Sequence, residues 1–118
     1  MMSAPKILLV SSDLLASSRL GGVARAAGHT LDVAAPASFP AATDYDLVLV
    51  DIQACPDPAA VIARSRTAAP AGRVLAFGPH VWKERLEQAV QAGADAAVTR
   101  GEVLEGLAAI LDRFAPRS

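Results

Sequence analysis

The residues with the clearest chemical potential in this chain stand where runs of apolar residues end. The run Leu47 to Asp51, LVLVD, ends in a carboxylate, and the run Lys6 to Val10, KILLV, is followed by Ser11 and Ser12. A carboxylate beside hydroxyl groups can accept hydrogen bonds, pair with a cation or act as a nucleophile. Arg100 follows a later apolar stretch and supplies a fixed positive charge. The chemistry that these residue types allow depends on whether the fold brings them together.

Apolar runs of this kind are typical of strands that helices cover on both faces of a parallel sheet. Three runs are continuous, namely Lys6 to Val10, Leu47 to Asp51 and Arg73 to Phe77. Two others, Thr30 to Ala35 and Ala94 to Thr99, are interrupted by an aspartate. We therefore predict three central strands and two edge strands.

Helical spacing of apolar residues separates these strands. The predicted helices are Leu14 to Ala27, Pro58 to about Thr67, Val81 to Gln91 and Glu102 to Phe114. The segment from Pro36 to Asp44 has two prolines and few helix formers, which predicts a loop or a single helical turn. In the first helix we expect Leu15, Leu20 and Val23 to face the core, and we interpret the glycines that follow Leu20 as sites of close packing on the sheet.

The alternation of strands and helices predicts an α/β fold with a parallel sheet and right-handed crossovers. Strand order 2-1-3-4-5 puts the continuous strands in the centre, with helices on both faces and the second helix shortened or absent. This is the flavodoxin-like arrangement, whose ligands bind beyond the carboxyl ends of the strands at the switch point. Ser11, Ser12 and Asp51 should then share one crevice, with Gly78 and Arg100 along its other side.

Composition limits the classes of function that are open to the chain. Its 118 residues form one predicted domain, residues 1–118, and 53% of them are hydrophobic while only 4% are aromatic, so the core should be aliphatic. A net charge of −1 without a basic patch argues against nucleic acid as a partner. No apolar run is long enough to span a membrane. A single cysteine and no signal peptide lead us to expect a cytoplasmic protein.

Several motifs together resemble the receiver domains of bacterial two-component response regulators. They are KILLV followed by a polar pair, DYDLVLVD, RVLAFG, and AVQAGADAAVTR before a closing amphipathic helix. The last of these is similar to the family phrase AxxAGAxxxxxK, which here spans Ala89 to Arg100. The resemblance covers essentially the whole chain and implies the five-stranded fold inferred above.

The resemblance also implies roles for individual residues. Asp51 matches the aspartate that accepts a phosphoryl group. The other functional positions of the family are altered: Ser11 and Ser12 stand for the acidic pair that holds Mg²⁺, Gly78 for a hydroxyl residue, Arg100 for a lysine, and Ala97 for an aromatic switch residue. Asp13 follows the serine pair one residue too late and should start the helix. Because Mg²⁺ requires carboxylates to offset its dehydration, we expect no metal and no other cofactor.

These departures predict a degenerate receiver, or pseudo-receiver, in which Arg100 pairs permanently with Asp51 with help from the Ser11 or Ser12 hydroxyl. Such a domain would not be an enzyme and would act in signalling by binding another protein or a second copy of itself. By analogy with the family, the binding face would comprise the fourth helix, fifth strand and fifth helix. Trp82 and Arg85 are its candidate contact residues.

Two alternatives remain open. The chain could be a standalone response regulator that accepts a phosphoryl group on Asp51, with Mg²⁺, in an atypical pocket. It could also be a small flavodoxin-like ligand-binding or enzyme domain, although no GxGxxG or phosphate-binding glycine loop follows the first strand. Cys55 has no adjacent basic residue to lower its pKa, and its distance in sequence from His29 and His80 argues against a metal site.

Overall fold

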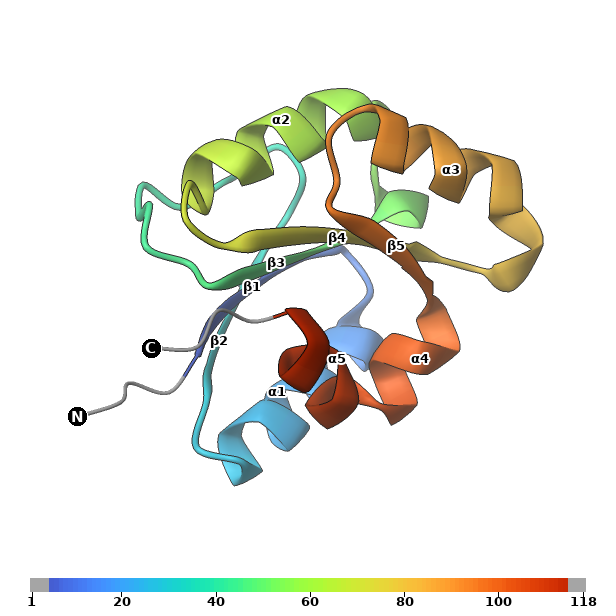
Figure 1. The fold of residues 1–118 in the computed structure, drawn as a ribbon. Coiled ribbons are helices and arrows are strands. Elements are labelled where there is room, and N and C mark those ends of the chain that lie inside the picture. The colour runs from blue at the N-terminus through green and yellow to red at the C-terminus, as the bar shows by residue number, and fades with distance from the viewer. Residues whose placement is uncertain (1–4, 115–118) are drawn as a thin grey trace.

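Five parallel strands form one sheet in the order β2-β1-β3-β4-β5 (Figure 1). The computed structural model describes residues 5–114. The strands are β1 Lys6–Val10, β2 Thr30–Ala34, β3 Leu47–Asp51, β4 Arg73–Gly78 and β5 Ala96–Thr99. The predicted fold class, strand order and edge strands are confirmed.

Five α-helices cover the two faces of the sheet. They are α1 Leu14–Ala26, α2 Pro58–Ala68, α3 Lys83–Gln91, α4 Arg100–Glu105 and α5 Leu107–Phe114, with short 3₁₀ turns at η1 Ile52–Ala54 and η2 His80–Trp82. Helices α2 and α3 lie on one face, and α1, α4 and α5 lie on the other (Figure 1). None of the helices among residues 5–114 is long and apolar enough to cross a membrane.

The core consists of two layers because side chains along each strand alternate between the faces. Val48 and Val50 of β3 pack toward α2 and α3, whereas Leu47 and Leu49 pack toward α1 and α5. Every residue of β3, including Asp51 at its end, is buried. This strand therefore holds Asp51 in a fixed position.

No helix lies between β2 and β3, as the sequence predicted. Phe39, Ala42 and Tyr45 of the connecting segment pack against the core, and the Tyr45 hydroxyl donates a hydrogen bond of 2.7 Å to Asp32. The chain thus covers this end of the sheet with a few side chains of a loop. It leaves edge strand β2 largely exposed.

The predicted inner face of α1 was wrong except for Leu20. Leu15 is 84% exposed and Val23 is 43% exposed, whereas Ala16, Leu20 and Ala24 are buried. The helix packs on the sheet through Leu20 and the small side chains of Ala16 and Ala24. In the sequence pattern, the larger hydrophobic residues Leu15 and Val23 had outweighed these two alanines. Close packing is also not the reason for the glycines after Leu20, because a Cβ atom on either one would meet nothing within 4 Å.

Two element boundaries near the C-terminus also differ from the prediction. The last helix is divided at Gly106, a residue type with low helix propensity, and α5 starts at Leu107. Strand β5 begins at Ala96, because the preceding Asp95 instead accepts a hydrogen bond of 2.8 Å from the backbone N–H of Val74. Asp95 also forms an ion pair with Arg66 at 2.5 Å.

Candidate functional site

The candidate site lies beyond the carboxyl ends of β1 and β3, at the switch point of the sheet. Residues Val10 and Val50 are paired across these strands, so Ser11 and Asp51 follow them side by side. The backbone N–H of Ser11 donates to the carbonyl oxygen of Ala34 at 3.0 Å. Both Ser11 and Asp51 are nearly inaccessible to solvent.

Both carboxylate oxygens of Asp51 contact other groups of the chain. The Ser11 hydroxyl donates to Oδ2 at 2.8 Å, and the backbone N–H of Gln53 donates to Oδ1 at 3.1 Å. The guanidinium Nη1 of Arg100 lies 3.6 Å from Oδ2. A buried carboxylate is stable only when hydrogen bonds or an opposite charge compensate it, and this one has both.

The same arginine also contacts Asp13. Nη2 of Arg100 donates to Oδ2 of Asp13, whose Oδ1 accepts the backbone N–H groups of Leu15 at 3.0 Å and Ala16 at 3.2 Å. Bonding to the Ala16 N–H, and then to Arg100, holds the pKa of the Asp13 carboxyl below its usual range. We refer to the contacts of Arg100 with Asp13 and Asp51 as the arginine bridge.

Asp13 is the residue whose role the sequence did not reveal. It caps α1, as expected, but it also positions Arg100, the first residue of α4. The only signal in the sequence is that Asp13 comes two residues after Ser11, at the end of the first strand. In space, the arginine bridge joins the start of α1 to the end of β3 and the start of α4.

Ile52 occupies the space beside Gly78 at the end of β4. A Cβ atom on Gly78 would lie 2.9 Å from Cγ1 of Ile52, closer than Cβ atoms approach other atoms, and 3.2 Å from its Cδ1, which is a tight contact. A hydroxyl residue at position 78 would therefore require Ile52 to move. Ser12, by contrast, is exposed at the mouth of the site.

The site carries two carboxylates and one guanidinium in a wide depression that Ser12, Gln53 and Pro79 also line. No group of three or more metal-ligating side chains occurs among residues 5–114. Asp13 and Asp51 both contact the guanidinium of Arg100, whose positive charge compensates the two carboxylates.

The remaining reactive residue types lie outside this arrangement. The Cys55 thiol is buried and donates to the Asp51 carbonyl oxygen at 3.3 Å. Burial, and then the negative charge of Asp51, raises the pKa of Cys55 to about 11, so the thiol stays protonated at neutral pH. His80 is exposed, and His29 directly precedes β2, at the opposite end of the parallel strands from the site.

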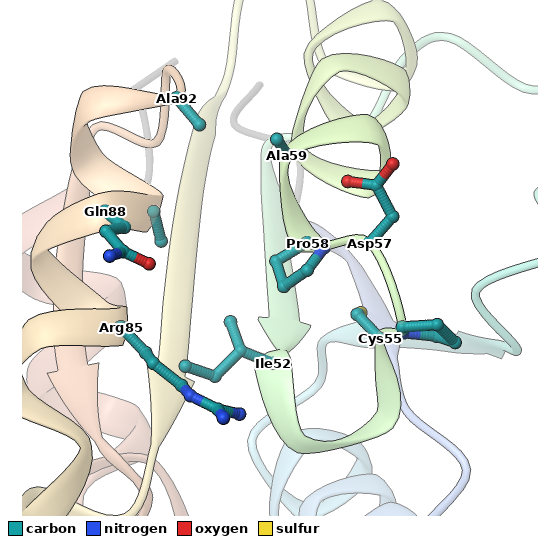
Figure 2. A pocket seen from close by; sticks show the side chains of 10 residues that line it. Ile52, Cys55, Asp57, Pro58, Ala59, Arg85, Gln88 and Ala92 are labelled. Carbon is teal, nitrogen blue, oxygen red and sulfur yellow. The ribbon is translucent and has the colours of Figure 1, made fainter.

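Trp82 and Arg85 lie together, and neither lines the groove between α3 and β5. The Arg85 guanidinium lies 4.5 Å from the centre of the Trp82 ring, and its side chain lines a groove between α3 and α2 (Figure 2). The opposite flank of α3 forms a second groove of about 360 Å³ with β5 and α4. Lys83, Glu87, Val90 and Thr99 are among its lining residues.

Comparisons with solved structures define the class of fold. Many of the structures that match are receiver domains of response regulators, and the chain shares their fold over nearly its whole length. The chemotaxis response regulator CheY4 of Vibrio cholerae matches with a TM-score of 0.78 and 17% identity, over 94% of this chain and 98% of that chain. A two-component response regulator from Clostridium difficile matches with a TM-score of 0.76 and 19% identity, over 92% of this chain and 93% of that chain. A response regulator from Thermotoga maritima matches with a TM-score of 0.75 and 19% identity, over 94% of this chain and 97% of that chain.

At the level of sequence, no family model and no curated protein matches the chain. The resemblance to receiver domains therefore rests on the fold and on the order of the short motifs. The residues of the site, which differ from the receiver pattern at Ser11, Ser12 and Gly78, must carry any argument about function.

Proposed function

We propose that this chain is a receiver-like signalling domain that acts by protein–protein interaction and without aspartyl phosphorylation. It is a non-enzymatic module with no metal or other cofactor. The observation that carries the proposal is the arginine bridge, in which one guanidinium contacts both Asp13 and Asp51.

Phosphoryl transfer to Asp51 would need a cation to neutralise the charge on the transferred group and an accessible carboxylate oxygen to attack it. Oδ2 of Asp51 accepts from Ser11 and faces Arg100, while Oδ1 accepts the N–H of Gln53. The Ile52 side chain fills the space where a receiver would carry its hydroxyl residue. Attack through Oδ2 would disturb the contacts with Ser11 and Arg100, and attack through Oδ1 would disturb the contact with Gln53.

Intact-mass measurement after incubation with acetyl phosphate and Mg²⁺ tests the proposal. We expect no adduct on the wild-type chain. A stable gain of about 80 Da that disappears in Asp51→Asn would overturn the absence of phosphorylation. Arg100→Ala, measured in parallel, tells whether the arginine bridge itself prevents the reaction.

A second candidate function, a response regulator that accepts a phosphoryl group, is favoured by one specific feature. Asp13 and Asp51 approach the same guanidinium, so release of Arg100 would leave two carboxylates that could hold Mg²⁺. Saturable Mg²⁺ binding to the wild-type chain, measured by calorimetry and abolished in Asp13→Asn, would support this alternative. We expect no heat of binding.

The groove between α3, β5 and α4 is the proposed contact surface for a partner or a second copy of the chain. Val90, 41% exposed, lines it, and Val81 near the start of α3 is 73% exposed. Arg85 and Trp82 lie outside this groove, so Val90→Glu is the sharper test. Light scattering over a range of concentrations should show self-association that Val90→Glu abolishes and that Val33→Glu, a similarly exposed valine on β2, leaves intact. A monomer at all concentrations would exclude the second copy.

A further inference from the structure

A second cavity, separate from the arginine bridge, lies between the start of α2 and the side of α3. It has a volume of about 360 Å³, within the range of small-molecule sites. Arg85 and Gln88 of α3, with Ala92 just after its end, line one wall, and Pro58 and Ala59 of α2 line the other (Figure 2). The interaction surface proposed above uses the opposite flank of α3, so this groove has no role yet.

The guanidinium of Arg85 stacks on Trp82 and forms no ion pair among residues 5–114. It lies 4.5 Å from the ring centre of Trp82, and Trp82 in turn packs against the core. Stacking of this kind orients the planar donors and reduces the entropy lost when they bind a ligand. Among residues 5–114, no carboxylate forms an ion pair with Arg85. Its donors remain available to an anion in the groove.

The other residues that line the groove indicate which chemical groups a bound anion would carry besides its negative charge. Gln88 adds amide donors next to Arg85, whereas Ile52, Pro58 and Ala89 present apolar atoms. Asp57, on the α2 side, adds a negative charge and uses Oδ1 to cap α2 by accepting the N–H of Ala60 at 3.3 Å. Asp57 offsets part of the attraction that Arg85 exerts on an anion, and desolvating a dianion costs more than desolvating a monoanion, so the groove suits a single negative charge better than a phosphate dianion.

We propose that the groove between α2 and α3 binds a small aliphatic monocarboxylate. The carboxylate is held by Arg85 and Gln88, and the branched apolar part packs on Ile52, Pro58 and Ala89. Ile52 also closes the space beside Gly78, so a bound ligand touches a side chain next to Asp51. The proposal is independent of the function proposed above, because it requires neither phosphorylation nor a protein partner.

Titration with sodium 4-methylpentanoate tests the proposal, with the neutral 4-methylpentanamide as the matched ligand. Trp82 is the only tryptophan, so its fluorescence reports contacts with Arg85 directly. Amide chemical shifts of Ile52, Gln88 and Ala89 give a second readout. We expect saturable binding of the acid and affinity for the amide at least about tenfold lower, since the charge-assisted hydrogen bonds to Arg85 are lost.

Three variants sharpen the test. Arg85→Gln should lower the affinity at least about tenfold, and Ala92→Leu should abolish binding by filling the groove. Arg64→Gln is the matched control, because Arg64 stacks on Phe39 at 4.8 Å in a different groove and should leave binding unchanged. A response that does not saturate, equal affinity for acid and amide, or unchanged affinity in Arg85→Gln would each overturn the proposal.

Discussion

Removal of the Arg100 side chain tests the energetic role of the arginine bridge. Fully buried ion pairs cost about 3–5 kcal/mol when one partner is removed, whereas exposed pairs contribute about 0–1 kcal/mol. Arg100 lies between these limits, since its side chain is 26% exposed while those of Asp51 and Asp13 are 3% and 33% exposed. Asp51 keeps its hydrogen bonds from Ser11 and Gln53 in the variant. We therefore expect Arg100→Ala to lower the free energy of unfolding by about 1.5–2.5 kcal/mol.

Urea unfolding followed by circular dichroism measures this loss. With a slope of about 1–1.5 kcal/mol per molar urea, the midpoint should fall by about 1–2.5 M. Asp51→Asn and the double variant complete a cycle, and we expect a coupling of about 1 kcal/mol between Arg100 and Asp51. Arg73→Ala is a control for loss of an arginine, because Arg73 is 56% exposed and lies 3.9 Å from Asp95. It should cost less than about 0.5 kcal/mol.

Two results would refute the reasoning. An Arg100→Ala cost no larger than that of Arg73→Ala would mean that the arginine bridge does not stabilise the fold. An equal cost in the wild-type and Asp51→Asn backgrounds would mean that Arg100 acts through another group. The same cycle with Asp13→Asn then shows whether that group is Asp13.

Four further predictions concern the surroundings of the site. Gly78→Ser should destabilise by about 1–3 kcal/mol in urea unfolding because its Cβ overlaps Ile52, and Ile52→Ala in the same chain should recover part of that loss. Gly21→Ala should stabilise by about 0.5–1 kcal/mol in the same assay, because its Cβ meets nothing and the unfolded chain loses freedom; a loss would restore the close-packing interpretation. Cys55, with its pKa raised to about 11, should react with iodoacetamide at pH 8 roughly a hundredfold more slowly than in urea, and equal rates would contradict its burial. The pKa of Asp13 lies below the ordinary 3.8, so the ionised carboxylate stabilises the fold above pH 3.8, and this stabilisation is lost as the pH falls through the lowered pKa. Asp13→Asn should therefore weaken the pH dependence of the urea midpoint below about pH 4.

The fold was predictable because a few long-range features of the sequence carry it. The uninterrupted apolar runs that end in Val10 and Asp51 indicated central strands, and Asp32 within β2 indicated an edge strand. Strand β5 is also an edge, although Asp95 precedes it and does not interrupt it. The proline-containing segment before Tyr45 correctly predicted the missing helix. These features predict the fold because a strand that is buried on both faces of a parallel sheet must consist almost entirely of apolar residues.

Details that depend on side-chain size and reach were not predictable. Helix α1 packs through Ala16 and Ala24, which a hydrophobic pattern scores below the exposed Leu15. The contact between Asp13 and Arg100 joins residues 87 positions apart and depends on where α1 and α4 start. Sequence spacing carries no information about such a contact until the register of the strands is known.

The altered positions of the site form one consistent arrangement in the structure. A receiver that switches would need a hydroxyl residue at position 78 and an aromatic residue at position 97 that can move. Here Gly78 leaves room for Ile52, and Ile52 and Leu86 both lie within 4 Å of the place where a Cβ atom on Gly78 would stand. Ala97 has no side-chain rotamer to change. Ile52 follows Asp51 in the chain and packs between Gly78 and Leu86 as an apolar side chain of the core. Ile52 is thus the side chain that the groove between α2 and α3 shares with the surroundings of Asp51, so we expect any influence of a groove ligand on the arginine bridge to depend on it.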